Sequence, residues 1–256
     1  MKQINLIAAV LLVIFSTACV QGESGDGNSI LSSRHTTVID TPSQDCPYCV
    51  QYNLKIEYPS SETARTNLLN ELFACGEDIS GLDMGELSKR IIDRASMEDI
   101  SFLEELWQDH RQTGYRYAAD TLSHSFDCSF LGNVRGYDNM EYTEDIFLGT
   151  AHPDISCKHV VLDSKGYVCA LEDVLKPGSV SGLTPVVKQS AEDFLNGFGA
   201  PVSILEDVDF YLSKDFYFNE DGIVFYYDKG TFGGWAIPAI EALVPWEKIE
   251  NYLSEQ

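Results

Sequence analysis

Strict alternation of apolar and polar positions characterises the sequence VQYNLKIEY. Its apolar members are Val50, Tyr52, Leu54, Ile56 and Tyr58. Side chains of a β-strand point alternately to opposite faces, so the pattern predicts a strand with one apolar and one polar face.

Helical spacing follows in three segments. Residues 59–78 begin with serine caps, carry an apolar stripe and end near Gly76, which predicts a helix. Residues 83–96 and 96–114 predict two more helices, the second with Ser96 as its N-cap. The stripe of the first helix consists of Leu68, Leu69, Leu72 and Phe73.

The remaining segments mix strands with one further helix. Residues 121–149 have the aromatic and β-branched content of two strands, and hairpins are expected over residues 160–171 and 216–227. Residues 183–199 predict a helix, and a strand stopped by Pro245 precedes a short terminal helix. Because helices and hairpins do not alternate regularly, the expected class is α+β, with antiparallel sheets and hairpins and several helices packed on them.

The first 18 residues predict an export signal. Lys2 precedes a short apolar run, and the sequence STAC then resembles the lipobox of bacterial lipoproteins, with Cys19 as the lipidated residue. An ordinary cleaved signal peptide is the alternative. Residues 19–45 are rich in Gly, Ser, Thr and Asp, which predicts a flexible tether. We therefore expect a protein that is exported and anchored by lipid to the bacterial cell envelope.

Acidic residues dominate the charge. The chain has 17 Lys and Arg against 40 Asp and Glu, a formal charge of −23, and loss of the first 18 residues removes one lysine to give −24. This charge argues against nucleic acid and against contact with membranes other than through the lipid anchor. It favours a basic protein ligand, although solubility alone also explains it.

Six cysteines remain after Cys19. An even number in an exported chain predicts disulfides, with zinc binding as the alternative, and the sequence does not fix the pairing. The six are Cys46, Cys49, Cys75, Cys128, Cys157 and Cys169.

The first two of these cysteines form the tetrapeptide CPYC, which is the dithiol motif of glutaredoxins. Dithiol chemistry requires a helix N-terminus that lowers the pKa of the first thiol, whereas a strand is predicted directly after Cys49. Structural disulfides are therefore the preferred interpretation, and a dithiol oxidoreductase is the alternative.

The sequence gives only a weak signal for catalytic or metal-binding residues. His152, Asp154 and His159 lie close in sequence, but His159 is expected to share a strand face with Cys157 while His152 lies in the preceding turn. Acidic pairs such as those of a glycosidase are expected by chance in so acidic a chain. We therefore predict no catalytic residue, no metal site and no cofactor.

Aromatic residues are dense near the C-terminus. One face of the hairpin over residues 216–227 is expected to be core, and the other face is a possible contact surface for a partner. Packing within the protein is the alternative. The residues of this possible surface are Tyr217, Tyr226, Phe232 and Trp235.

Two long segments resemble the RsiV-like extracellular domain family. They are YTEDIFLGTAHPDISCKHVVLDSKGYVCALEDVLKPG and FYFNEDGIVFYYDKGTFGGWAIPAIEALVPWEKIENYL. Residues 52–74 are similar to the companion domain of polysaccharide-deacetylase and RsiV-like proteins. The family turn GGAHG reads LGTAHP in this chain, so a role that depends on its glycines is not carried over.

The resemblance implies an N-terminal α+β lobe over residues 46–178 and a C-terminal RsiV-like lobe over residues 179–256, packed as one unit. It also implies an extracytoplasmic binding or sensor-like module without catalysis of its own. In RsiV the comparable domain binds lysozyme, which is basic, so a cationic protein of that type is the expected ligand. A cell-envelope glycan- or peptide-processing enzyme and the dithiol oxidoreductase are the alternatives.

Overall fold

The computed structural model describes residues 19–23, 29–41, 46–74, 76–79, 81–114, 121–149, 152–206, 208–233 and 237–254. The predicted export signal, Cys75 and Trp235 lie outside these ranges. None of the helices in the described ranges combines the length and the apolar character needed to span a membrane.

The described strands form two sheets, and the larger one follows the chain in strand order. Neighbouring strands in this sheet run antiparallel, except for the third and fourth strands, which are parallel. The strands are β1 (Cys19–Glu23), β2 (Ser29–Asp40), β3 (Cys49–Pro59), β4 (Thr121–Val134), β5 (Tyr137–Phe147) and β6 (Asp154–Leu162).

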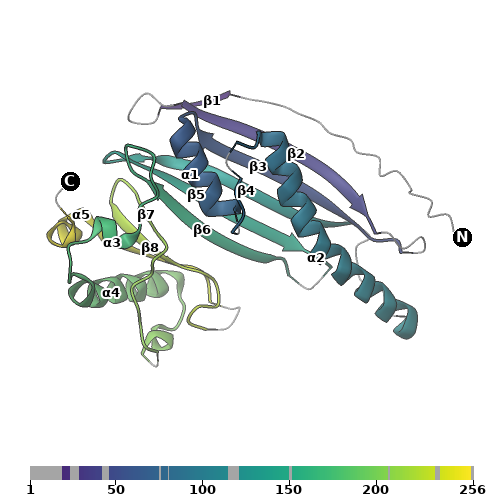
Figure 1. Cartoon of the computed structure of the whole chain (residues 1–256). Helices are drawn as coiled ribbons and strands as arrows, with labels where there is room; N and C mark the ends of the chain where they lie inside the picture. Colours follow the sequence, from purple (N-terminus) through teal and green to yellow (C-terminus); the bar gives the residue numbers. More distant parts are fainter. Residues whose placement is uncertain are drawn as a thin grey trace, which may run out of the picture.

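Two helices connect the parallel strands β3 and β4. They are α1 (Glu62–Phe73) and α2 (Met84–Thr113), and both lie on the same face of the larger sheet (Figure 1). The predicted strand after Cys49 is confirmed, and its apolar residues face the helices to form the first core. Its polar residues lie on the other sheet face, which these helices leave uncovered.

Of the residues that the composition assigns to a flexible tether, 19–23 form β1 and 29–40 form β2. Strand β2 pairs with the whole length of β3, from Ile30 opposite Pro59 to Asp40 opposite Cys49. Its Thr, Val and Ile residues are typical of strands. The polar residues that indicate a tether belong here to a strand whose partner supplies the backbone hydrogen bonds.

Helix α2 replaces the two helices predicted over residues 83–114. Asp83 and Glu86 form a capping box at its start, and Gly114 ends it in a left-handed conformation. Ser96, the predicted N-cap, lies inside the helix, where its hydroxyl donates to the carbonyl of Asp93. The last buried side chain of α2 is Leu103, and the helix continues past the edge of the sheet (Figure 1).

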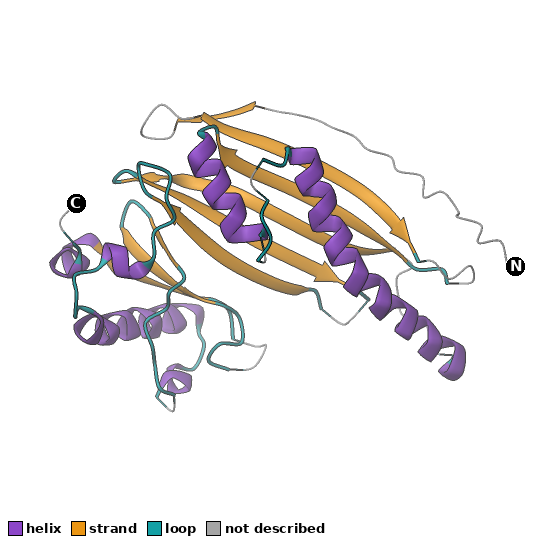
Figure 2. Ribbon diagram, viewed as in Figure 1, coloured by secondary structure: helices purple, strands orange, loops and turns teal. Residues whose placement is uncertain are grey.

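A smaller sheet and further helices form the C-terminal part (Figure 2). The predicted hairpin over residues 216–227 is confirmed as β7 (Phe216–Phe218) and β8 (Gly222–Tyr227), and β9 (Ile240–Pro245) completes this antiparallel sheet. The helices are α3 (Leu171–Val174), α4 (Val180–Phe198), η1 (Val202–Leu205), α5 (Trp246–Ile249) and η2 (Glu250–Tyr252).

The α+β class is confirmed, with two hydrophobic cores. The first core lies between the larger sheet and the helices α1 and α2, and the second lies around α4 and the smaller sheet. The second core already includes Val161, Leu171 and Val174, which the sequence places in the N-terminal lobe. The hairpin predicted over residues 160–171 is reduced to a single bridge between Leu162 and Val168, followed by α3.

Candidate functional site

The aromatic residues of the predicted contact surface lie largely inside the protein. Tyr226 and Phe232 are only 8% and 9% exposed, and Tyr217 is half-buried. The rings of Tyr217 and Tyr226 both pack on His159, with centroid distances of 4.5 and 4.9 Å. These rings therefore contribute to the junction between the two sheets.

The structure contains no disulfide among Cys46, Cys49, Cys128, Cys157 and Cys169. Cys49 is the first residue of β3, so the CPYC sequence leads into a strand and not into a helix. The helix dipole that activates a glutaredoxin thiol is therefore missing at this position. Disulfide formation stays a prediction.

A buried hydrogen-bonded cluster lies between α2 and the larger sheet. The two ring nitrogens of His124 lie 2.8 Å from carboxylate oxygens of Asp99 and Glu144, and the Tyr52 hydroxyl donates to the same Asp99 oxygen. His124 is 3% exposed. Burial lowers the pKa of His124, but the hydrogen bonds and charges of the two carboxylates outweigh this effect and raise it to about 9. The cluster is an internal ion pair that fixes α2 on the sheet.

A second cluster lies on the opposite face of the sheet, where β5 and β6 meet β7. Glu141 of β5 pairs with His159 of β6, and Cys157 lies two residues before His159 on the same face. His159 Nδ1 is 2.9 Å from an oxygen of Asp215, a residue 56 positions away in the chain. The sequence places Cys157 and His159 on one face but gives no signal for Asp215 or Glu141, because both contacts arise only in the folded chain.

Burial changes the acidity of the groups around this second cluster. Burial first, and then the charge of Glu141, raise the pKa of the Cys157 thiol to about 12. Burial also raises the pKa of Tyr217 to about 12 and raises the pKa of Tyr226 further. These three groups are therefore neutral at physiological pH.

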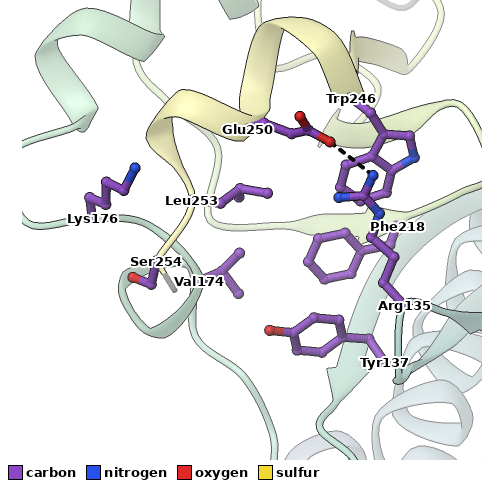
Figure 3. Close-up of a pocket in the computed structure, with 9 residues that line it drawn as sticks. All are labelled: Arg135, Tyr137, Val174, Lys176, Phe218, Trp246, Glu250, Leu253 and Ser254. Atoms are coloured by element: carbon purple, nitrogen blue, oxygen red, sulfur yellow. Dashed lines mark hydrogen bonds and ion pairs between the residues drawn. The ribbon is translucent and has the colours of Figure 1, made fainter. Parts of the chain in front are cut away.

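A cleft of about 270 Å³ lies where the turn between β4 and β5 meets the C-terminal helices (Figure 3). Arg135 lies over the ring of Trp246 at 3.7 Å from its centroid and forms a 3.1 Å ion pair with Glu250. Tyr137 and Phe218 stack in the wall of the cleft. Arg135 lies in the turn between β4 and β5, and both of its partners lie in the C-terminal helices. Its guanidinium therefore links the larger sheet to the C-terminal part.

The outer surface of α2 is acidic toward the C-terminal end of the helix. Glu98, Glu105 and Asp109 are exposed, and the sequence between Arg94 and Arg111 contains no basic residue other than His110. Met97 is 71% exposed and Phe102 is 36% exposed on the same part of the helix. This surface, defined by residues 97–109, is called the acidic end of α2 below.

Comparisons with known proteins support the fold. A family model described as "Protein of unknown function (DUF3298)" matches residues 172–247. No curated protein matches the chain.

Two solved structures of DUF3298 family proteins are similar to this chain. One is from Bacteroides fragilis, with a TM-score of 0.67 and 16% identity, covering 97% of this chain and 96% of that one. The other is from Pseudomonas aeruginosa, with a TM-score of 0.61 and 13% identity, covering 87% of this chain and 94% of that one. Identities this low establish a shared fold alone.

Proposed function

We propose that this chain is an exported, lipid-anchored module that binds a cationic protein at the bacterial cell envelope. The proposed contact surface is the acidic end of α2. From the RsiV-like resemblance, a lysozyme-type enzyme is the specific ligand class that we propose. The proposal assigns no catalytic residue to the chain.

The observation that supports the proposal is the position of the exposed residues on α2. Glu98, Phe102, Glu105 and Asp109 are spaced i, i+4, i+7 and i+11, so they share one face of the helix. This face is exposed along its whole length, and the helix continues past the sheet edge. A protruding helix with acidic side chains around an exposed aromatic ring offers both charge and apolar area to a partner.

Charge complementarity explains why a basic partner fits this surface. Acidic side chains attract a cationic protein over a distance of about 10 Å at 0.1 M salt, which accelerates encounter. Met97 and Phe102 then provide apolar area that becomes buried at contact, and such area supplies most of the affinity in protein interfaces.

Calorimetry with a lysozyme as the titrant tests the proposal. The variant Glu98→Gln/Glu105→Gln/Asp109→Asn removes three charges from α2, and Glu206→Gln/Asp209→Asn/Glu220→Gln removes three exposed charges from the C-terminal part as a matched control. At about 0.2–1 kcal/mol for each exposed charge, the α2 variant is expected to bind roughly 3- to 150-fold more weakly.

The control variant is expected to keep the affinity of the wild type. Equal weakening in both variants would show that only the total charge matters. Absence of binding by the wild type, at low as well as moderate salt, would remove the proposed ligand class.

A further inference from the structure

We propose that Glu141, Cys157 and His159 form a binding site for a divalent transition-metal ion, with Zn²⁺ as the best fit. The site lies on the face of β5 and β6 opposite α1 and α2, beside β7. It is separate from the acidic end of α2 and does not depend on the proposed function.

The strand register brings the three side chains together. Glu141 and His159 are directly paired across the antiparallel strands, and Cys157 is two residues away on β6, so all three point to one face. One ligand atom from each residue lies within 4.8 Å of the others. A tetrahedral zinc site with bonds of about 2.0–2.3 Å has ligand atoms roughly 3.5 Å apart, so only a small adjustment is required.

His159 is oriented as a metal ligand. Its Nδ1 and its backbone N–H both lie within hydrogen-bonding distance of the same Asp215 oxygen, at 2.9 and 3.1 Å. A proton on Nδ1 leaves the lone pair of Nε2 free, and a carboxylate in this position typically fixes the tautomer of a zinc-binding histidine.

The other nitrogen of His159 has no hydrogen-bond partner, although the residue is only 7% exposed. Its closest carboxylate oxygen, on Glu141, is 3.6 Å away, which is too far for a hydrogen bond but matches the separation of two ligands on one metal ion. The stacked ring of Tyr217 holds the imidazole in this orientation. A buried nitrogen without a partner is costly, and a metal ion at this position removes the cost.

Cys157 is not placed to form a disulfide with Cys49, Cys128 or Cys169. Cys169 pairs with Val161, four residues along β6, which separates it from Cys157 by about 13 Å. Cys128 faces the helices on the opposite side of the sheet. Following the register from β6 back to β3 identifies the β3 residue that is level with Cys157. Cys49 lies six residues before that residue along β3, a separation of about 20 Å along the strand direction. The side-chain hydrogen-bond partner of the Cys157 thiol is the Tyr226 hydroxyl, and a sulfur that ligates a metal can still accept this hydrogen bond.

The donor set favours zinc over magnesium or calcium. One thiolate, one imidazole and one carboxylate form a mixed S, N, O set, which suits Zn²⁺ and related transition metals, whereas Mg²⁺ and Ca²⁺ require oxygen ligands. Thiolate and carboxylate together balance the charge of the ion. The Glu141 side chain is 37% exposed, so the ion has access from solvent and a fourth position remains for water.

Metal binding is tested on the full chain, purified without a polyhistidine tag, reduced and treated with a chelator. Co²⁺ serves as a spectroscopic probe, because a cobalt thiolate gives a charge-transfer absorption that cobalt bound to oxygen and nitrogen alone lacks. The wild type is expected to bind one equivalent of Co²⁺ with this absorption, and Zn²⁺ is expected to displace it.

Variants separate this site from other thiols in the chain. Cys157→Ser is expected to lose the absorption, whereas Cys169→Ser and Cys46→Ser/Cys49→Ser are expected to retain it. Glu141→Gln changes a partly exposed side chain and is expected to weaken binding without loss of fold. Asp215→Asn is expected to reduce the affinity by about 10- to 100-fold through the orientation of His159.

The competing account is a histidine that is held in place by Asp215 and the rings of Tyr217 and Tyr226 and has no role in metal binding. Under that account the wild type shows no stoichiometric metal binding, which would overturn the proposal. Retention of the thiolate absorption in Cys157→Ser, or its loss in the Cys46→Ser/Cys49→Ser variant, would overturn it as well. Near-UV circular dichroism of each metal-free variant verifies that the fold is retained.

Discussion

The buried cluster around His124 predicts that the stability of this protein falls as the pH rises above about 6.5. The folded protein raises the pKa of His124 from its ordinary value of 6.5 to about 9. A raised pKa means that the folded state binds the proton more tightly than the unfolded state. The resulting stabilisation is fully present below pH 6.5 and is lost as the pH rises through 9.

The magnitude follows from the size of this shift. A difference of about 2.5 pKa units corresponds to roughly 3 kcal/mol, since each unit is about 1.4 kcal/mol. About 2 kcal/mol of this amount is lost between pH 6.5 and 8.5. That loss is large against a total stability of about 5–15 kcal/mol for a typical domain.

The pH range is chosen to isolate His124. Burial lowers the pKa of His35, so its effect on stability lies below pH 6.5. Burial also raises the pKa of the Cys157 and Cys169 thiols to about 12 and raises that of the Cys128 thiol further, so these groups reduce stability as the pH rises above about 8.5, where unfolded thiols ionise. Between these limits His124 dominates the predicted slope.

Urea unfolding at pH 6.5, 7.5 and 8.5 measures the effect, with His124→Gln compared against the wild type and His152→Gln as the exposed control. The wild type and the control are expected to lose about 2 kcal/mol over this range, and His124→Gln is expected to lose much less. The same dependence of the free energy of unfolding on pH in all three proteins would refute the reasoning. A histidine resonance of His124 that titrates near pH 6.5 in the folded protein would refute it independently.

Three further predictions concern the packing of the chain. A Cβ added to Gly222 would lie 2.1 Å from the carbonyl oxygen of Val244, so Gly222→Ala is expected to lower the free energy of unfolding by about 1–3 kcal/mol. The control is Gly197→Ala, which has open space around the added Cβ and is expected to be neutral or stabilising. Asn139→Leu leaves the backbone N–H of Phe218 without its 2.7 Å acceptor between the two sheets and is expected to cost about 1–3 kcal/mol, with exposed Asn251→Leu as the control. Asp83→Ala removes the capping box of α2 and is expected to lower the free energy of unfolding by about 0.5–2 kcal/mol. The loss is measured as faster hydrogen exchange of the backbone amides near residue 84.

Features that depend on local sequence are predictable in this chain. The alternation after Cys49, the stripe of α1 and the hairpin over residues 216–227 each depend on neighbouring residues, and the corresponding elements form as expected. Strand β2 is missed because its Ser and Thr residues resemble a linker, and only the pairing with β3 makes it a strand. Residues 83–114 form one helix because no glycine or proline interrupts the chain near Ser96, although a serine followed by acidic residues is typical of a helix start.

The two polar clusters depend on contacts between distant parts of the chain. Asp99 meets His124 across 25 residues, and Asp215 meets His159 across 56 residues. Periodicity predicts the strand face of Cys157 and His159, but it cannot indicate which carboxylates face them. The aromatic residues of the C-terminal hairpin show the same limit, because alternation identifies two faces and only the fold shows that β5 and β6 cover the second face.

Hydrogen exchange of the whole chain, with and without a saturating lysozyme-type protein, tests the proposed function most directly. Backbone amides of α2 between residues 97 and 113 are expected to exchange more slowly in the complex, because contact at the acidic end of α2 suppresses local opening of the projecting helix. Amides of β7, β8 and β9 are expected to be unchanged and serve as the internal reference. Protection confined to the smaller sheet, or no protection in any part of the chain, would contradict the account.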